Sequence, residues 1–269
     1  MRLAAVVTAV MLAACASAPE PASPLDDPAW GDGKADGPAT DWTAVGRGVA
    51  YQRVNAGHAI VLAYGGYTAR LSDAAAWATE LVTARLGATD VGQIYAIQGP
   101  ADAGYDGREI ANTRLRAHLL TIDDGTSPIY VVAHSSGSYV AHELLGQLAA
   151  AGDTGVLARI AYADLDGGGS GLTPALVDGL RRVTFVSAHD PTLTAGYSRN
   201  HATAVALAAA YAPHATSFVV EVPATGCDDA AAWCLHDVLV THRPHDPAHY
   251  DLAEDYTDFV DRPVTTEYF

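Results

Sequence analysis

The sequence predicts an α/β fold, in which a mostly parallel central sheet is flanked by helices. Short apolar runs rich in β-branched residues alternate with segments whose apolar residues recur at helical spacing, as in proteins with such a sheet. The 269 residues are 49% apolar and 17% charged, which lets the chain bury a core and excludes intrinsic disorder. One apolar run, residues 129–133, breaks into a turn of small residues that leads into a helix.

The N-terminal segment predicts export. Residues 1–14 have a basic start, an apolar run and then small residues, the order found in secretory signal peptides. The apolar run is about half of the ~20 residues that cross a bilayer, so it does not predict a transmembrane helix. Residues 12–15 read Leu-Ala-Ala-Cys and resemble the bacterial lipobox. The resemblance implies a lipidated Cys15 and, with Ala16 next, an outer-membrane anchor; an ordinary secretory peptide is the alternative.

Residues 15–44 are expected to form the lipidated cysteine and a flexible tether, and residues 45–269 a single domain. The tether is dominated by Pro, Ala, Gly, Asp and Ser, and it has too few large aliphatic residues to fold alone. No internal repeat and no second linker follow in the sequence. The domain is therefore expected to be attached to the bacterial cell envelope through the lipid anchor.

The three cysteines fit this arrangement. An exported protein with three thiols leaves one unpaired unless one of them carries lipid. With Cys15 used in this way, Cys227 and Cys234 remain, seven residues apart and in a compartment that preserves disulfides. We expect them to be bonded and to close a short loop, the alternative being two free buried thiols.

Within the domain, strands are expected where the apolar runs occur, at residues 59–64, 93–97, 129–133, 159–163, 183–187 and 217–222. Residues 49–54 are expected to add an antiparallel edge strand. Helices are expected where apolar residues recur at helical spacing: Trp77, Leu81 and Val82; Ile110, Leu115 and Leu119; Val140, Leu144, Leu145 and Leu148. Helix starts are expected at Ser72, Asp106 and Thr173, the last followed by Pro174 in the favoured first position.

The turn after residues 129–133 reads His-Ser-Ser-Gly and contains the candidate nucleophile, Ser135. A sharp turn from strand to helix forces such a serine out of the sheet, and the helix N-terminus favours negative charge that develops there. The segment resembles the nucleophile elbow of α/β-hydrolases, although Ala133 replaces the first glycine of the G-x-S-x-G pattern. Ser136 is the alternative nucleophile. The alternative to a nucleophilic role is that the serine only caps the helix.

The resemblance to the α/β-hydrolase superfamily covers most of the chain after residue 45, and it implies an α/β-hydrolase fold with a small or absent cap domain. In that family the residue after the nucleophile donates one oxyanion-hole amide, and the loop after the third strand donates the other. The matching positions here are Ser136 for the first donor and Gly66 or Tyr67 for the second.

The resemblance also implies an acid and a histidine, in the order serine, acid, histidine along the chain. The acid of this family usually follows the second strand after the nucleophile strand, which selects Asp190. Asp164 and Asp166 are the alternatives, because some relatives place the acid one strand earlier. Their segment also has the oxygen ligands of a cation loop, but it lacks a terminal glutamate at calcium-loop spacing, which favours a solvated turn.

Four histidines near the C-terminus are candidates for the base: His236, His242, His245 and His249. His236 lies two residues beyond Cys234, where a disulfide would give the rigid support that a general base needs. His245 is the main alternative, because cutinases and fungal lipase-like esterases have the histidine ten or more residues after a short disulfide loop. The chain offers no regular helical zinc pair, since Pro247 separates His245 from His249.

The family resemblance implies a serine hydrolase that cleaves carboxylic esters of small molecules or lipids and needs neither a metal nor another cofactor. The net charge of −16, from 15 basic and 31 acidic residues, excludes nucleic acid as a partner. The acidic excess near the C-terminus argues against highly anionic substrates there. An inactive binding lipoprotein on a hydrolase scaffold and a metal-dependent hydrolase are the alternatives.

Overall fold

The computed structural model describes residues 42–46, 48–54, 56–67, 69, 71–80, 91–100, 108–221, 227, 232–237 and 239–240. Its strands are β1 (Thr43–Gly46), β2 (Val49–Arg53), β3 (Ala59–Tyr64), β4 (Val91–Ile97), β5 (Ile129–His134), β6 (Ile160–Leu165), β7 (Arg182–His189) and β8 (Ala215–Glu221). Its helices are α1 (Leu71–Glu80), α2 (Arg108–Ile122), α3 (Gly137–Ala150), α4 (Thr154–Leu157), α5 (Pro174–Asp178), α6 (His201–Ala210) and α7 (Ala232–Asp237).

All eight strands form one sheet in the order β1-β2-β4-β3-β5-β6-β7-β8. The pairs from β4 to β8 are parallel, whereas β2 is antiparallel to both β1 and β4. The predicted antiparallel strand is therefore confirmed, but β1 is the edge strand next to it. β1 begins at Thr43, inside the segment that the sequence assigned to the tether. The predicted fold class, a mostly parallel sheet flanked by helices, is confirmed.

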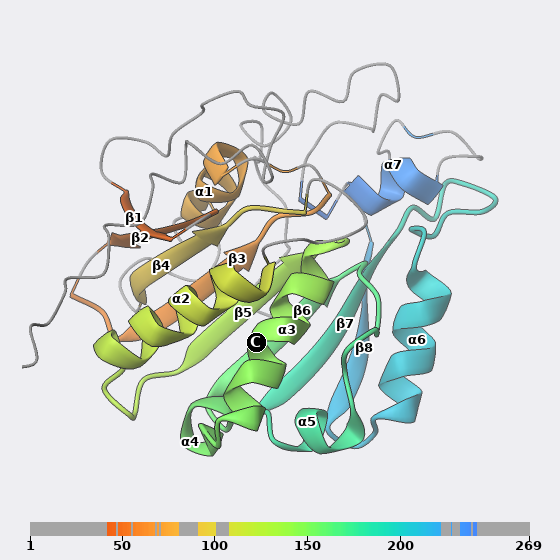
Figure 1. Ribbon diagram of the computed structural model, residues 1–269. Coiled ribbons are helices and arrows are strands. Elements are labelled where there is room, and N and C mark those ends of the chain that lie inside the picture. The colour runs from red at the N-terminus through yellow and green to blue at the C-terminus, as the bar shows by residue number, and fades with distance from the viewer. Residues whose placement is uncertain are drawn as a thin grey trace, which may run out of the picture.

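Helices cover both faces of the sheet (Figure 1). On one face, α2 to α6 contribute to a core that contains Leu115, Leu144 and Tyr162. On the other face, Trp77 of α1 belongs to a second core cluster, which also contains Leu239, just after α7. The central strands β3 and β6 are buried at every position, as expected of parallel strands covered on both sides. This enclosure explains why the strands could be recognised from continuous apolar runs.

Local signals in the sequence placed several elements well. The strand predicted at residues 59–64 matches β3, and the others differ from the observed strands by a few residues at their ends. Thr173 caps α5 as predicted, because the Leu176 amide donates to its Oγ1 at 3.2 Å and Pro174 occupies the first helical position. Helix α1 begins one residue before the predicted Ser72. The predicted start at Asp106 lies outside the described residues.

The parallel strands end together at one edge of the sheet, which we call the carboxyl edge. Gly65 follows β3, Ser135 follows β5, Asp166 follows β6 and Asp190 follows β7. Ligands of open α/β sheets bind outside this edge. The residue types that the sequence singled out are therefore gathered there by the topology itself.

Several predictions fall outside the described residues: the signal peptide, the lipidated Cys15, most of the tether, and the C-terminal segment with His242, His245 and His249. Within the part of the chain that the structure describes, no helix is both long and apolar enough to cross a membrane.

Candidate active site

Ser135 lies in the turn between β5 and α3 with a left-handed backbone, φ +54°. This conformation costs a residue with a side chain of order 1–3 kcal/mol, and it is typical of functional sites that the surrounding structure holds in place. The turn is held by a hydrogen bond from the Ser135 amide to the Leu165 carbonyl at 3.0 Å and by one from the Ser138 amide to the Ser135 carbonyl at 3.1 Å. The predicted elbow is thus a tight strand-to-helix turn with Ser135 at its tip.

Small residues around this turn are required by close backbone contacts. A Cβ on Gly137 would lie 2.3 Å from the Gly65 carbonyl oxygen, so the helix can approach the loop after β3 only with glycine there. Ala133 tolerates its extra methyl because it lies within the sheet, opposite Asp164 of β6, and is fully buried. The departure from the family pattern therefore leaves the turn intact.

Two of the predicted oxyanion-hole residues adjoin Ser135: Ser136 follows it in the chain, and Gly66 lies beside it. A Cβ on Gly66 would lie 3.3 Å from the Cβ of Ser135, so the backbone of Gly66 passes directly beside the serine. Within the described residues, the amides of Ser136, Gly66 and Tyr67 donate no hydrogen bond to another group. Unused amide donors beside a serine can stabilise an oxyanion that develops there.

Asp166 and His236 form a buried pair at the carboxyl edge. Nδ1 of His236 lies 2.5 Å from Oδ2 of Asp166, and both side chains are almost completely buried. The same carboxylate accepts hydrogen bonds from Ser198 Oγ at 2.6 Å and from the Asn200 amide at 3.1 Å. Because the carboxylate only accepts, Nδ1 of His236 donates to it, which leaves Nε2 as the nitrogen that can take a proton.

Asp190, the predicted acid, contacts Thr192. Its Oδ1 accepts from the Thr192 amide at 2.9 Å and from Thr192 Oγ1 at 2.6 Å, which closes the turn after β7. The structure brings Asp166, the predicted alternative, to His236 instead. The acid follows β6, and the loop after β7 contributes Ser198 and Asn200 to hold it.

Asp164, the other alternative, is buried. Its Oδ1 accepts from the Gly167 amide at 2.8 Å, and burial, aided by the charge of Asp166, raises its pKa well above the usual range. Nearby, Tyr162 donates to Nε2 of His142 at 2.8 Å, and Nδ1 of His142 donates to the Ser170 carbonyl at 2.8 Å. Asp164 therefore belongs to a polar cluster beneath the loop that presents Asp166.

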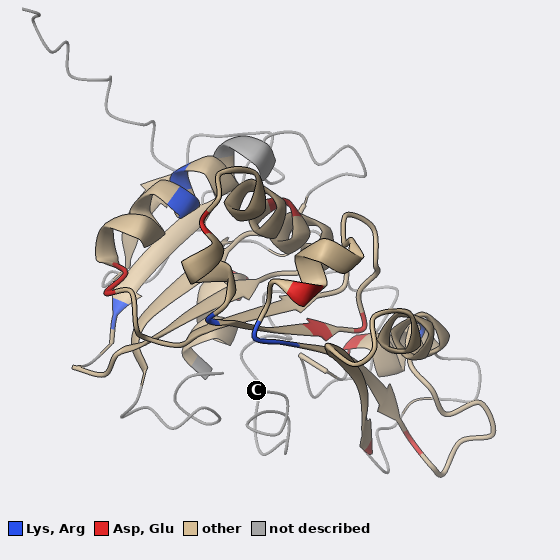
Figure 2. Cartoon of the chain, turned by 90° about the horizontal axis from the view of Figure 1, so that it is seen from below, with Lys and Arg blue, Asp and Glu red and all other residues tan. Residues whose placement is uncertain are grey.

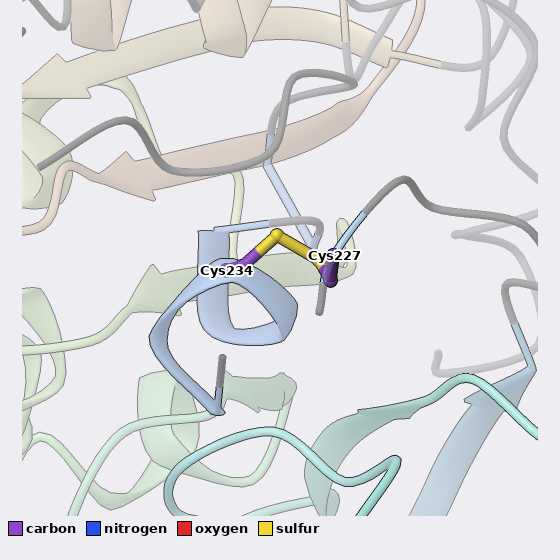
Figure 3. Close-up of a disulfide and its surroundings, with 2 residues drawn as sticks. All are labelled: Cys227 and Cys234. Carbon is purple, nitrogen blue, oxygen red and sulfur yellow. A yellow bond between two sulfur atoms is a disulfide. The ribbon is translucent and has the colours of Figure 1, made fainter. Parts of the chain in front are cut away.

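His236 is carried by α7, whose position is fixed by the predicted disulfide. Cys234 on this helix is bonded to Cys227 (Figure 3). The ring of His236 lies 4.7 Å from that of His134, the residue before Ser135, and the His236 carbonyl accepts from His134 Nε2 at 3.2 Å. These contacts bring His236 beside the serine turn. Within the described residues, the Ser135 hydroxyl itself makes no hydrogen bond, and such contacts are often long without substrate.

His134 was not predicted as a site residue, and it lies between Ser135, its neighbour in the chain, and the ring of His236. Because a carbonyl accepts from its Nε2, its other nitrogen, Nδ1, is an acceptor, and this buried atom has no partner among the described residues. Burial lowers the pKa of His134 well below the usual range, and the nearby His236 lowers it further. A neutral His134 adds no charge that would oppose protonation of His236.

Two other features of the described residues could bind a ligand. In the described part of the chain, one group could hold a metal ion, since ligand atoms of His134, His236 and Asp237 lie within 4.8 Å of one another. A metal there would use His236, the same imidazole that donates to Asp166. A groove of about 540 Å³ runs along α3 beside Tyr139 and His142, and its lining includes neither Ser135 nor His236.

No protein-family model and no curated protein matches this chain. Solved structures resemble it at low identity. A protein assigned as a thioesterase from a Silicibacter species is 15% identical over 80% of this chain and 84% of its own, with a TM-score of 0.45. Naproxen esterase from Bacillus subtilis is 10% identical over 65% of this chain and 79% of its own, with a TM-score of 0.42. A thermostable esterase is 15% identical over 69% of this chain, with a TM-score of 0.41, and the match spans only 54% of that protein.

Proposed function

We propose that this protein is a serine hydrolase that cleaves carboxylic esters, with Ser135 as nucleophile, His236 as general base and Asp166 as the acid that orients it. One observation carries the proposal: Nδ1 of His236 lies 2.5 Å from Oδ2 of Asp166. His236 is on α7 and lies beside the serine turn. A buried histidine that donates to a carboxylate has its other nitrogen set to accept a proton from a nucleophile.

In the proposed reaction, Ser135 Oγ attacks the ester carbonyl while His236 Nε2 takes the hydroxyl proton. The oxyanion that forms accepts hydrogen bonds from the Ser136 amide and from the amide of Gly66 or Tyr67. The protonated His236 then gives its proton to the leaving alcohol, which breaks the ester bond and leaves an acyl group on Ser135. Water, deprotonated by His236, attacks the acyl-enzyme and releases the carboxylic acid.

The substrate class is proposed as small-molecule or lipid esters. The described residues at the carboxyl edge support this, because Tyr67 and Trp233 are about half exposed next to the proposed oxyanion donors and to His236. Exposed aromatic side chains beside a reactive group can pack against the apolar part of an ester.

A fluorophosphonate probe tests the nucleophile, because it labels only an activated serine. We expect the purified domain to be labelled at Ser135 and to hydrolyse short p-nitrophenyl esters. Ser135→Ala should lose both properties, whereas Ser136→Ala should keep them, since the buried Ser136 hydroxyl has no partner. A folded protein that takes up no label would instead favour the binding lipoprotein on a hydrolase scaffold.

We also propose that the mature chain is attached to the bacterial cell envelope, in the outer membrane, through lipid on Cys15. The leader and the lipobox-like residues 12–15 support this. Expressed with its full leader, the protein should fractionate with membranes and incorporate a labelled fatty acid. Cys15→Ser should abolish the incorporation while leaving ester hydrolysis unchanged, and label that persists in this variant would contradict the proposed anchor.

A further inference from the structure

Arg199 lies on the outside of the proposed active site, one contact away from His236. Its guanidinium carbon is 3.6 Å from the centre of the Trp233 ring, and that ring meets His236 edge-on with centroids 5.3 Å apart. The Arg199 amide also donates to the Ala232 carbonyl at 3.1 Å, which ties its loop to the start of α7. The arginine is therefore held at a defined place beside the base.

Neighbouring residues in the loop set the direction of this side chain. Ser198 and Asn200 both donate to Asp166, so the residues on either side of Arg199 face the buried acid. Arg199 between them is exposed and faces Trp233, which is 48% exposed. The same short segment thus holds the proposed catalytic acid on its inner side and presents a cation on its outer side.

The stacked arrangement leaves the hydrogen-bonding edge of Arg199 available. A guanidinium that stacks on an aromatic ring uses its flat face, and its N–H groups point outward in the plane, where they match a carboxylate with two parallel hydrogen bonds. Two other arginines in the described residues pair with acids: Arg116 with Asp153 at 2.6 Å, and Arg159 with Asp123 at 2.5 Å. No ion pair of Arg199 occurs in the described part of the chain.

Arg199 is also conspicuous for its charge. The whole chain has 31 acidic and 15 basic residues, and Lys and Arg occupy only a few separate places on the described ribbon (Figure 2). A cation without an acidic partner, fixed next to the proposed base in an acidic protein, favours a negatively charged ligand. The net charge of −16 opposes ligands with several negative charges and so favours a single carboxylate over a phosphate.

We propose that Arg199, stacked on Trp233, is a specificity-determining residue that binds a carboxylate of the ester substrate. This inference rests on the proposed ester hydrolysis and deepens it: the preferred substrates are esters that carry one carboxylate apart from the ester bond. Arg199 takes no part in proton transfer.

Two matched esters test the inference. 4-Acetoxybenzoate and 4-acetoxybenzamide have the same size and the same acetyl ester, but only the first has a carboxylate. We expect the wild type to prefer 4-acetoxybenzoate in kcat/KM. Arg199→Gln should lower kcat/KM for this ester about tenfold or more, chiefly through KM, and should leave the benzamide within about twofold. Arg199→Lys should recover part of the preference, since it keeps the charge without the planar fork.

Arg181→Gln is the control, because it removes the same charge from an exposed arginine at the opposite edge of the sheet, just before β7. It should change neither ester's kcat/KM by more than about twofold, since charges this far apart are screened. If Arg199→Gln lowers both esters equally, Arg199 only supports Trp233 and the inference is overturned. A wild type without preference for the carboxylate ester overturns it as well.

Binding of 4-hydroxybenzoate, measured by calorimetry, separates this inference from the proposed function. It is the product of the first ester and needs no chemistry to bind. If neither ester is cleaved but 4-hydroxybenzoate binds the wild type and not Arg199→Gln, ester hydrolysis is refuted and the carboxylate site stands. If both esters are cleaved and 4-hydroxybenzoate binds neither protein, the carboxylate site is refuted and the hydrolase stands.

Discussion

Oδ2 of Asp166 lies 2.5 Å from Nδ1 of His236, although seventy residues separate them in the chain. The acid follows β6 and the histidine lies on α7, so the pair joins two segments that only the folded sheet brings together. The loop after β7 completes the arrangement through Ser198 and Asn200, which both donate to the acid. Among the three candidate acids, we propose Asp166 on the basis of this contact.

Asp166→Asn is expected to lower kcat for ester hydrolysis by about 10³–10⁴-fold while the protein stays folded. Ser198 Oγ and the Asn200 amide hold one oxygen of Asp166, so the asparagine NH2 group would face Nδ1 of His236 and donate to it. The imidazole would then lose the tautomer that it needs as a base. Asp190→Asn is the matched control, because an asparagine retains an Oδ1 that can accept from Thr192. Its kcat should stay within a few-fold of wild type. Steady-state kinetics with p-nitrophenyl acetate would measure both, and the opposite ranking would restore Asp190 as the acid.

Two glycines of the same helix should respond in opposite ways to alanine. Gly137→Ala places a Cβ 2.3 Å from the Gly65 carbonyl oxygen, so the elbow must shift, and both stability and fluorophosphonate labelling should fall. Gly146→Ala meets nothing within 4 Å and should stabilise the protein by about 0.5–1 kcal/mol through helix propensity. Urea unfolding monitored by circular dichroism would measure both free energies. Equal effects would show that the close approach at Gly137 is relieved at no cost.

Loss of the disulfide should lower ester hydrolysis more than it disturbs the central sheet. The bond between Cys227 and Cys234 closes a seven-residue separation and holds the helix that carries His236. In the chain-entropy relation, a disulfide that closes a loop of this size stabilises the folded state by roughly 2–3 kcal/mol. Here it holds a short surface helix rather than the core. The Cys227→Ser/Cys234→Ser variant should therefore lose most ester turnover while its far-UV circular dichroism stays close to wild type.

Hydrogen exchange would locate the change in the disulfide variant. Amides of α7 should exchange faster, whereas those of β5 and β6 should keep their protection. Full activity in the double serine variant would mean that contacts such as the hydrogen bond between His134 and the His236 carbonyl suffice to hold α7.

Acid should destabilise the protein through buried neutral histidines. Burial lowers the pKa of His142 from 6.5 to about 4. The folded state then prefers the neutral ring, so His142 has no effect on stability above pH 6.5. Between pH 6.5 and 4 the unfolded chain takes up a proton before the folded one does. The free energy of unfolding should therefore fall with acidification, by up to about 3 kcal/mol from this residue.

His142→Gln tests this, because glutamine can still donate to the Ser170 carbonyl and accept from Tyr162. Its unfolding free energy, from urea titrations at pH 7, 6, 5 and 4, should decline less steeply than that of wild type. Part of the slope should remain, since His134 is also buried with a lowered pKa. His58→Gln, at an exposed position, is the control. An unchanged slope in His142→Gln would contradict the assigned protonation.

Much of the site could be predicted because its signals are local in the chain. The apolar strand, the small-residue turn and the helix around Ser135 lie within about twenty residues, and turn chemistry is set by neighbours. The glycines after β3 are local as well, although the need for Gly137 is explained only by the Gly65 carbonyl, which belongs to another segment. Edge strand β1 was missed, because it has only four residues and their burial does not alternate along the strand.

The sequence alone determined the fold class, the position of Ser135 and the pairing of Cys227 with Cys234, because periodicity, turn residues and cysteine spacing are written in short stretches of chain. Only the tertiary structure decided between Asp190 and Asp166 as partner of His236. Both acids end neighbouring parallel strands, and which one meets the imidazole depends on how the loops after β6 and β7 pack against α7. A contact between residues seventy positions apart leaves no local pattern, since it is fixed by the burial and hydrogen bonding of the assembled edge.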